Sequence, residues 1–162
     1  MSDQHGAGAP PAGQATLNVL AQYVKDLSFE SPNSPKILAT APPQGGPQIN
    51  VQVNVNARQI EAQNFEVELA IEVKAMLGQD VMFLAEVLYA GIFRIAGLVD
   101  EELRAVILIE CPRLLFPFAR QIIADATRNG GFPPLLIDPI DFVALYQRRM
   151  SDDGVGPAVG TA

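Results

Sequence analysis

The sequence has little of the material from which catalytic and metal-binding sites are built. It contains one cysteine, one histidine and no tryptophan. A single cysteine, Cys111, excludes an intramolecular disulfide and fits a reducing compartment. The histidine, His5, lies in a Gly-, Ala- and Pro-rich segment that cannot hold a base against a nucleophile. No Cys/His cluster has zinc-site spacing. We therefore expect no enzyme, no metal and no cofactor.

Basic residues are also scarce. Lys and Arg number 11 against 18 Asp and Glu, which gives a formal net charge of −7. A nucleic-acid-binding surface needs clustered cations, so this charge argues against such a partner. The first basic residue is Lys25, so no signal peptide is expected. No apolar run approaches the roughly 20 residues of a membrane-spanning helix. We expect a cytoplasmic protein without direct membrane insertion.

Composition divides the chain into three parts. Residues 1–16 and 151–162 have too little apolar content to pack, and we predict a disordered N-terminal arm and a disordered C-terminal tail. Residues 17–150 are predicted to form one domain. A Pro- and Gly-rich connection over residues 36–48 interrupts it. Connections of this length in a compact domain are usually functional or disordered.

The first half of the domain alternates with the period of β-strands. Strands are predicted at 17–30, 48–57, 65–74 and 81–93, with a tight hairpin at 78–80. In the first strand, one side is predicted to carry Leu17, Val19, Ala21, Tyr23, Leu27 and Phe29, and the other Asn18, Gln22, Asp26, Ser28 and Glu30. The last strand is apolar on both faces, so it is either covered twice or meets a partner.

The second half has the period of helices. The acidic residues 100–102 predict a helix start, and Pro112 is predicted to begin a second, longer helix that ends at 129–131. Asp138 and Pro139 are predicted as the N-cap and first residue of a last helix that runs to Met150. Strands followed by helices predict an α+β fold, with a four-stranded antiparallel sheet and helices packed on one face.

Several blocks, taken in order, resemble the SecB family of protein-export chaperones. They are YVKDLSFESPNSP (23–35), FLAEV (83–87), GIFRIAGL (91–98), CPRLLFPFAR (111–120), GFPPL (131–135) and DPIDFVALY (138–146). The resemblance implies the fold predicted above, assembled as a homotetramer that is a dimer of dimers. It also implies an ATP-independent holdase that binds unfolded precursor proteins, keeps them competent for translocation and delivers them to the SecA motor.

The resemblance assigns residues to three surfaces. The zinc-bearing basic tail of SecA would be received by Asp26, Glu30, Leu84 and Glu86. Positions tied to oligomer assembly are Ala85, Val87 and Tyr89, where many family members carry Cys-x-Val-x-Gln. Client contacts are expected at Ile49, Val51, Val53, Phe116, Tyr146 and Met150, with Phe118 as a further candidate. Strand parity agrees with the first set, because Asp26 and Glu30 share a side, as do Leu84 and Glu86.

Three alternatives stay open. A SecB-like chaperone dedicated to one client, such as an antitoxin, would have the same fold. An enzyme with an unrecognised site and a purely structural oligomerisation domain are the others. The complete SecA-facing set favours the export role over the first alternative, and the lack of an ordered histidine argues against the second.

Overall fold

The computed structural model describes residues 13–155. The predicted arm over residues 1–12 and the predicted tail over 156–162 lie outside the described residues. Four long strands form one antiparallel sheet in the order β1-β4-β3-β2. They are β1 (Thr16–Glu30), β2 (Gln48–Glu61), β3 (Asn64–Leu77) and β4 (Asp80–Ala96). Because sequential helices follow these strands, the predicted α+β class is confirmed.

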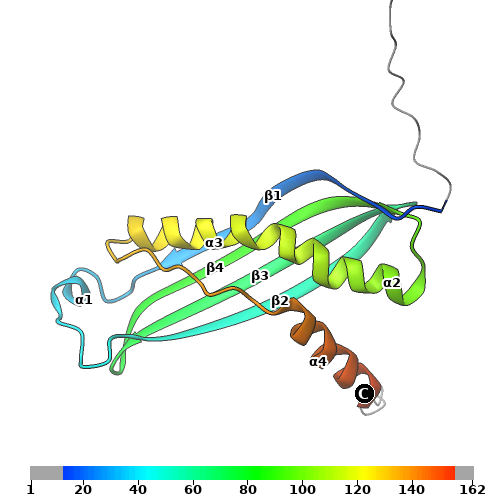
Figure 1. Ribbon diagram of the computed structural model, residues 1–162. Helices are drawn as coiled ribbons and strands as arrows, with labels where there is room; N and C mark the ends of the chain where they lie inside the picture. The colour runs from blue at the N-terminus through cyan, green and yellow to red at the C-terminus, as the bar shows by residue number, and fades with distance from the viewer. Residues whose placement is uncertain (1–12, 156–162) are drawn as a thin grey trace, which may run out of the picture.

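Helices lie on one face of this sheet, and the other face is open (Figure 1). The helical elements are α1 (Lys36–Ala39), α2 (Asp100–Ala105), the π-helical turn η1 (Val106–Glu110), α3 (Cys111–Asn129) and α4 (Phe142–Val155). The long helix α3 packs mainly against β4 and β3. Within the described part of the chain, no helix combines the length and apolar character needed to cross a membrane.

The core lies between α3 and the two central strands. Fully buried side chains from β3 and β4, including Leu69, Ile71 and Val87, face Leu115 and Ile123 of α3. Gly91 of β4 is required at the point of closest approach. A Cβ atom there would lie 2.8 Å from the Phe93 ring and 3.0 Å from Leu115 Cδ2. The absence of that side chain lets α3 settle directly onto the sheet.

The helical run over residues 100–129 is continuous, whereas the sequence predicted two helices with a start at Pro112. The π-helical turn η1 precedes Cys111 and Pro112 directly and joins α2 to α3 without a break. Proline has no N–H to donate, so a local change of hydrogen-bond register ahead of it carries little further loss. The helix end is as predicted, because Gly130 N donates to Ala126 O at 2.9 Å.

The last helix begins later and ends later than predicted. Asp141, not Asp138, is its N-cap, since Asp141 Oδ1 accepts a hydrogen bond from Ala144 N at 3.0 Å. The segment around Asp138 and Pro139 stays irregular. The helix α4 continues to Val155, five residues past the domain boundary expected at Met150. The first part of the predicted tail is therefore helical.

Strand β1 departs from the predicted alternation at two β-bulges. Its register against β4 shifts between Val19 and Ala21, and again between Val24 and Asp26. Each extra residue turns the following side chains to the opposite face of the sheet. The placement of Ala21 and Tyr23 beside Leu17 was therefore wrong.

Contacts on the two faces show the result of the first bulge. Tyr23 lies on the open face, where its hydroxyl donates to Glu66. Gln22 turns to the helix side, where its Oε1 accepts a hydrogen bond from Tyr89 Oη at 3.1 Å. The second bulge restores the predicted sides for Phe29, whose ring stacks on Phe83 with centroids 5.6 Å apart. Asp26 is consequently left on the open face.

Candidate partner-binding surfaces

The four residues expected to receive the motor tail lie together on the open face. The register places Glu30 beside Leu84 and Ser28 beside Glu86, with Asp26 beside Leu88. Asp26, Glu30 and Glu86 are exposed, and Leu84 is half-buried. Leu84 and Glu86 share the open face, as the strand parity predicted, and Leu84 lies between Glu30 of β1 and Lys74 of β3.

Glu72 belongs to the same surface, and sequence reasoning missed it. It is exposed on β3 and lies directly across from Glu86 of β4. We call Asp26, Glu30, Glu72 and Glu86, with Leu84 beside Glu30, the acidic surface. None of these carboxylates forms an ion pair within the described residues. Alternation along β3 placed Glu72 on a polar side, but only the strand register shows which residue it opposes.

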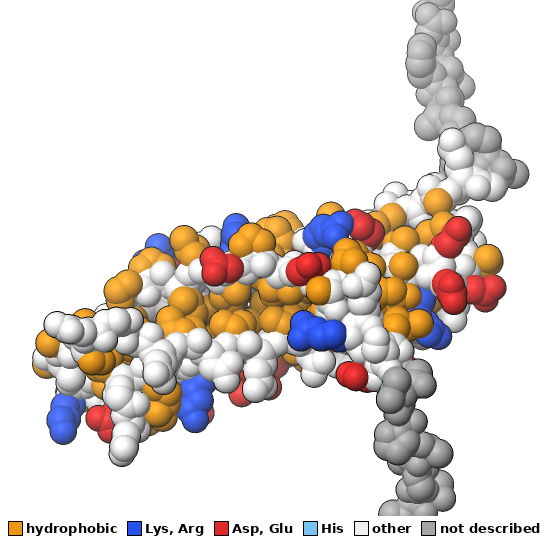
Figure 2. Space-filling model, turned by 60° about the horizontal axis from the view of Figure 1, so that its bottom comes forward, with side chains coloured by type: hydrophobic (Ala, Val, Ile, Leu, Met, Phe, Trp, Pro, Cys, Tyr) orange, Lys and Arg blue, Asp and Glu red, His pale blue; other side chains and the backbone are white. Residues whose placement is uncertain are grey.

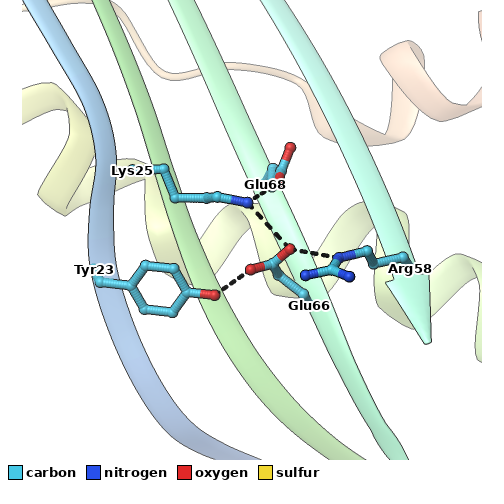
Figure 3. A network of polar contacts seen from close by, with 5 residues as sticks. All are labelled: Tyr23, Lys25, Arg58, Glu66 and Glu68. Carbon is cyan, nitrogen blue, oxygen red and sulfur yellow. Dashed lines mark hydrogen bonds and ion pairs between the residues drawn. The ribbon is translucent and has the colours of Figure 1, made fainter. Parts of the chain in front are cut away.

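A second group of carboxylates on the open face is compensated internally (Figure 3). Glu66 of β3 accepts hydrogen bonds from Tyr23 Oη, from Arg58 Nε at 2.8 Å and from Lys25 Nζ at 3.3 Å. Lys25 also donates to Glu68 at 2.5 Å. The Glu66 side chain is only 5% exposed. We call these five residues the Glu66 network; it joins β1, β2 and β3 across β4.

The network shifts the pKa values of its members. Hydrogen bonds from Tyr23 and then Arg58 lower the pKa of Glu66 to about 2. Burial, followed by the hydrogen bond to Glu66, raises the pKa of Tyr23 to about 12. Tyr23 is therefore protonated and Glu66 ionised at neutral pH. Fixed protonation states suit a structural role better than proton transfer.

No reactive or metal-binding group stands out in the described residues. Burial raises the pKa of the Cys111 thiol to about 12, so it is not a thiolate at neutral pH. Among residues 13–155, no group of three or more His, Cys, Asp and Glu side chains is placed to hold a metal ion.

An apolar groove lies at the hairpin end of the sheet. Its cavity of about 380 Å³ is bounded by the connection that contains α1, by the β3–β4 hairpin and by the segment after α3. Its apolar lining includes Ile37, Leu38, Ile49, Met82, Phe132 and Leu135. Ile49 and Leu38 are more than 40% exposed. We call this cavity the apolar groove; the resemblance predicted only Ile49 within it.

A second groove runs between β2 and α4. Two adjoining cavities, of about 480 and 410 Å³, share Asn54, Leu145 and Arg148. Val51 and Val53 line the first and Tyr146 the second. Figure 2 turns this side toward the viewer and shows hydrophobic side chains with Lys and Arg beside them. We call this hollow the β2–α4 groove. Three of the six expected client contacts therefore line it.

Phe116 and Met150 lie away from both groove linings. Phe116 is 7% exposed and packs edge-on against Phe142 with ring centroids 6.2 Å apart. Its neighbour Phe118 is 51% exposed, because the two positions lie on opposite sides of α3. Met150 Sδ lies 3.9 Å from Arg104 Nη1 of α2. Phe116 is thus a core residue in the folded protomer.

The expected oligomer positions are buried inside the protomer. Ala85 and Val87 are 0% and 2% exposed beneath the helices, so they present no surface to a second chain. Tyr89 is buried too, but its ring stacks on the exposed Phe118 with centroids 6.1 Å apart. Val24 and Leu27 of the edge strand β1 are also exposed. Val24, Leu27 and Phe118 form an apolar patch on the surface, and the buried Ala85, Val87 and Tyr89 lie beneath it.

Comparison with known proteins agrees with this architecture. Residues 11–153 match the family model described as Preprotein translocase subunit SecB. The chain is 56% identical over 154 residues to Protein-export protein SecB of Xanthobacter autotrophicus, covering 95% of this chain and 97% of that one. It is 55% identical over 150 residues to the protein of the same name from Azorhizobium caulinodans, covering 93% and 92%.

A solved structure has the same fold at low sequence identity. It is that of the Mycobacterium tuberculosis Rv1957 SecB-like chaperone in complex with a ChAD peptide from the Rv1956 HigA1 antitoxin. The TM-score is 0.63 at 16% identity, covering 77% of this chain and 91% of that one. At that identity the likeness supports the fold and not the partner. Together with the matches over nearly the whole chain, the sheet and its helices show that this chain belongs to the SecB family of protein-export chaperones.

Proposed function

We propose that this chain is a cytoplasmic holdase that works without ATP. It binds unfolded secretory precursors, keeps them competent for translocation and delivers them to SecA. The observation that carries this proposal is the presence of two chemically different surfaces on one protomer. An apolar groove lies at the hairpin end, and a groove of mixed polar and apolar lining runs along β2. The acidic surface lies on the open face and borders the β2–α4 groove at Glu72.

The grooves are suited to unfolded chains of many sequences. Burial of apolar surface is non-directional and contributes roughly 25 cal/mol per Å². β2 is an edge strand, so its outer backbone groups are free to pair with an extended segment. Arg149 occupies one of them, since its Nη1 donates to Val55 O at 2.6 Å. Ile49, Val51, Val53 and Tyr146 are therefore the client contacts we favour, with Phe116 and Met150 secondary.

The acidic surface is suited to a basic partner. The resemblance assigns Asp26, Glu30, Leu84 and Glu86 to the zinc-bearing tail of SecA. The strand register adds Glu72. Uncompensated carboxylates raise the rate of encounter with a cationic segment and favour it over acidic competitors. Leu84 supplies an apolar contact at the end of the surface, between Glu30 and Lys74.

Assembly into a homotetramer, a dimer of dimers, would repeat both surfaces. β1 is the second edge strand of the sheet, and the exposed Val24, Leu27 and Phe118 lie on its helix side. We expect this patch to meet a second copy, while Ala85, Val87 and Tyr89 hold α3 in place beneath it. Several grooves in one assembly raise the effective concentration for a long client.

Titration calorimetry with two ligands tests the proposal. The ligands are the zinc-loaded tail peptide of SecA and a reduced, unfolded model protein. Reversal of Asp26, Glu30 and Glu86 to Lys should abolish peptide binding because like charges repel. Client binding should persist, because it depends on the grooves. Raising the salt concentration should lower the affinity for the peptide more than the affinity for the client.

Two outcomes would contradict the proposal. Peptide binding that survives the triple reversal would show that the acidic surface is not the docking site. Loss of client binding in an intact assembly would show that the two surfaces are not separate. Mass spectrometry of complexes captured from lysate addresses the alternatives: many precursors with SecA support export, whereas a single client supports a dedicated chaperone.

A further inference from the structure

The Glu66 network sits at the place where β1 changes parity. Tyr23 precedes the second bulge, Lys25 is its extra residue, and Asp26 follows it. Both Tyr23 and Lys25 reach across β4 to the same carboxylate on β3 (Figure 3). The residue of β4 that they cross is Ala90, which pairs with Tyr23 on one side and Glu68 on the other. Its small side chain leaves room for the tyrosine ring and the lysine stem.

The bulge decides which face receives Asp26 and Glu30. A one-residue shift of strand parity moves every following side chain to the other face of the sheet. β1 is an edge strand, so its register is held by β4 alone among the strands. Beyond the bulge, Phe29 is anchored on the helix side by Phe83 and by Phe132, whose centroids lie 5.6 and 6.4 Å away. Before the bulge, the anchor on the open face is Glu66.

Burial and charge support this assignment. Glu66 is one of two buried polar residues in the described part of the chain, and three donors from two other strands satisfy it. Arg58 of β2 is 68% exposed, so it closes the network toward solvent. Glu68 lies on the same strand and face and makes the shorter contact to Lys25, at 2.5 Å against 3.3 Å for Glu66, but within the network it does not contact Tyr23 or Arg58. It therefore provides a charge-matched comparison.

We propose that Glu66 is a positioning residue for partner docking, which fixes the β1 bulge chiefly through Tyr23, with Lys25 shared with Glu68, and so keeps Asp26 and Glu30 on the open face. This inference rests on the proposed docking of the SecA tail at the acidic surface. Glu66 itself need not touch the tail. Its effect is on the geometry of two carboxylates that do.

The test compares Glu66→Gln with Glu68→Gln in the full chain. Each removes one negative charge from the same face. Glu66→Gln should weaken binding of the zinc-loaded tail peptide about tenfold, because charged hydrogen bonds at the bulge are lost. Glu68→Gln should weaken it no more than about twofold. Amide exchange over residues 26–30, measured without peptide, should accelerate much more in Glu66→Gln, which loses the Tyr23 contact, than in Glu68→Gln. Affinity for the unfolded client should be unchanged in both.

Tyr23→Phe is the second variant, because it keeps the ring and removes one hydrogen bond. Tyr23→Phe should lower the affinity for the tail peptide about threefold. If Glu66→Gln does not fold, this variant tests the positioning role in its place. Equal weakening by both Gln variants would show that charge, not position, matters and would overturn the inference. Wild-type peptide affinity in Glu66→Gln and Tyr23→Phe would overturn it as well. If the wild-type chain binds no peptide, the proposed docking fails. Unchanged exchange at 26–30 would then separately refute the positioning role.

Discussion

Glu86 of β4 and Glu72 of β3 lie directly opposite each other on the open face, and neither forms an ion pair within the described residues. Like charges at paired positions of a sheet are unfavourable by a few tenths of a kcal/mol or more. The nearest cation along β3 is Lys74, which lies opposite Leu84. The arrangement makes sense if a basic partner supplies the missing positive charge.

Replacing Glu72 with Gln should separate folding from docking. We expect the free energy of unfolding to rise by roughly 0.2–1 kcal/mol, because the repulsion with Glu86 disappears. Affinity for the zinc-loaded SecA tail peptide should fall about threefold. Urea denaturation and calorimetry measure the two effects. The control is Glu61→Gln, an exposed position at the far end of β2. If that control reproduced both changes, overall charge would be responsible.

The Glu66 network should give the protein a distinctive stability profile with pH. The pKa of Glu66 is about 2 in the folded chain against an ordinary value of 4.5. The contribution of ionised Glu66 to the free energy of unfolding is therefore complete above pH 4.5 and is lost as the pH falls toward 2. Urea unfolding across this range should show a steeper loss for the wild type than for Glu66→Gln. If the free energy of unfolding fell equally steeply with pH in both proteins, the pKa of Glu66 would not be lowered by the network.

Tyr23 should affect the free energy of unfolding at alkaline pH. Its pKa is raised from 10.0 to about 12, so the unfolded chain loses this proton first. The contribution of Tyr23 is present below pH 10 and declines between 10 and 12. Tyr23→Phe should flatten this part of the profile. If the loss of stability between pH 10 and 12 were unaltered in that variant, the pKa of Tyr23 would not be raised by burial and by its hydrogen bond to Glu66.

The N-cap of α4 can be tested by two matched substitutions. Asp141→Ala should lower the free energy of unfolding by about 1 kcal/mol, because the bond to Ala144 N is lost. Asp138→Ala should have little effect, since the chain there is irregular. Amide exchange over residues 142–146 should accelerate only in the first variant. The opposite result would restore the cap predicted from the sequence.

Oligomeric state tests the apolar patch beside β1. Light scattering at micromolar concentration should give about four times the chain mass of 17.4 kDa. Phe118→Glu should shift the protein to smaller species, because a charge would be buried against a second copy. Leu136→Glu is the control, as this residue is 67% exposed on the segment between α3 and α4. A wild-type monomer at high concentration would rule out the tetramer.

The sequence predicted the sheet well where its alternation was regular. Residues 49, 51, 53 and 55 share one side of β2, as expected. Prediction failed in β1, where an extra residue at each bulge reverses the parity and moves Tyr23 to the open face. A bulge has no strong local signature, because it is stabilised by partners on other strands such as Glu66. The position of Glu72 opposite Glu86 also could not be predicted, because it depends on the register of β3 against β4.

Helix ends show the same limit. Asp138-Pro139 is as good a start signal as Asp141, and only packing selects between them: Phe142, directly after Asp141, is 2% exposed. Similarly, Phe116 and Phe118 are the same type of residue two positions apart, yet Phe116 is buried and Phe118 is exposed. Family resemblance named both Phe116 and Phe118 as client contacts and could not assign the buried and exposed sides of α3.

The π-helical turn at Val106–Glu110 also constrains how the chain can vary in length. Such a turn holds one residue more than the α-helix around it. Removing a single residue there would let the segment become a regular α-helix, because the missing residue is the one that the wider turn holds in excess. α2 and α3 would keep their angular relation, and Leu115 would stay against Gly91. A deletion inside α3 has no excess residue to absorb it. Successive residues of an α-helix are about 100° apart, so the side chains beyond such a deletion would turn by that angle relative to the sheet. The segment Val106–Glu110 is therefore a place in this helical run where losing one residue leaves the phase of both helices intact.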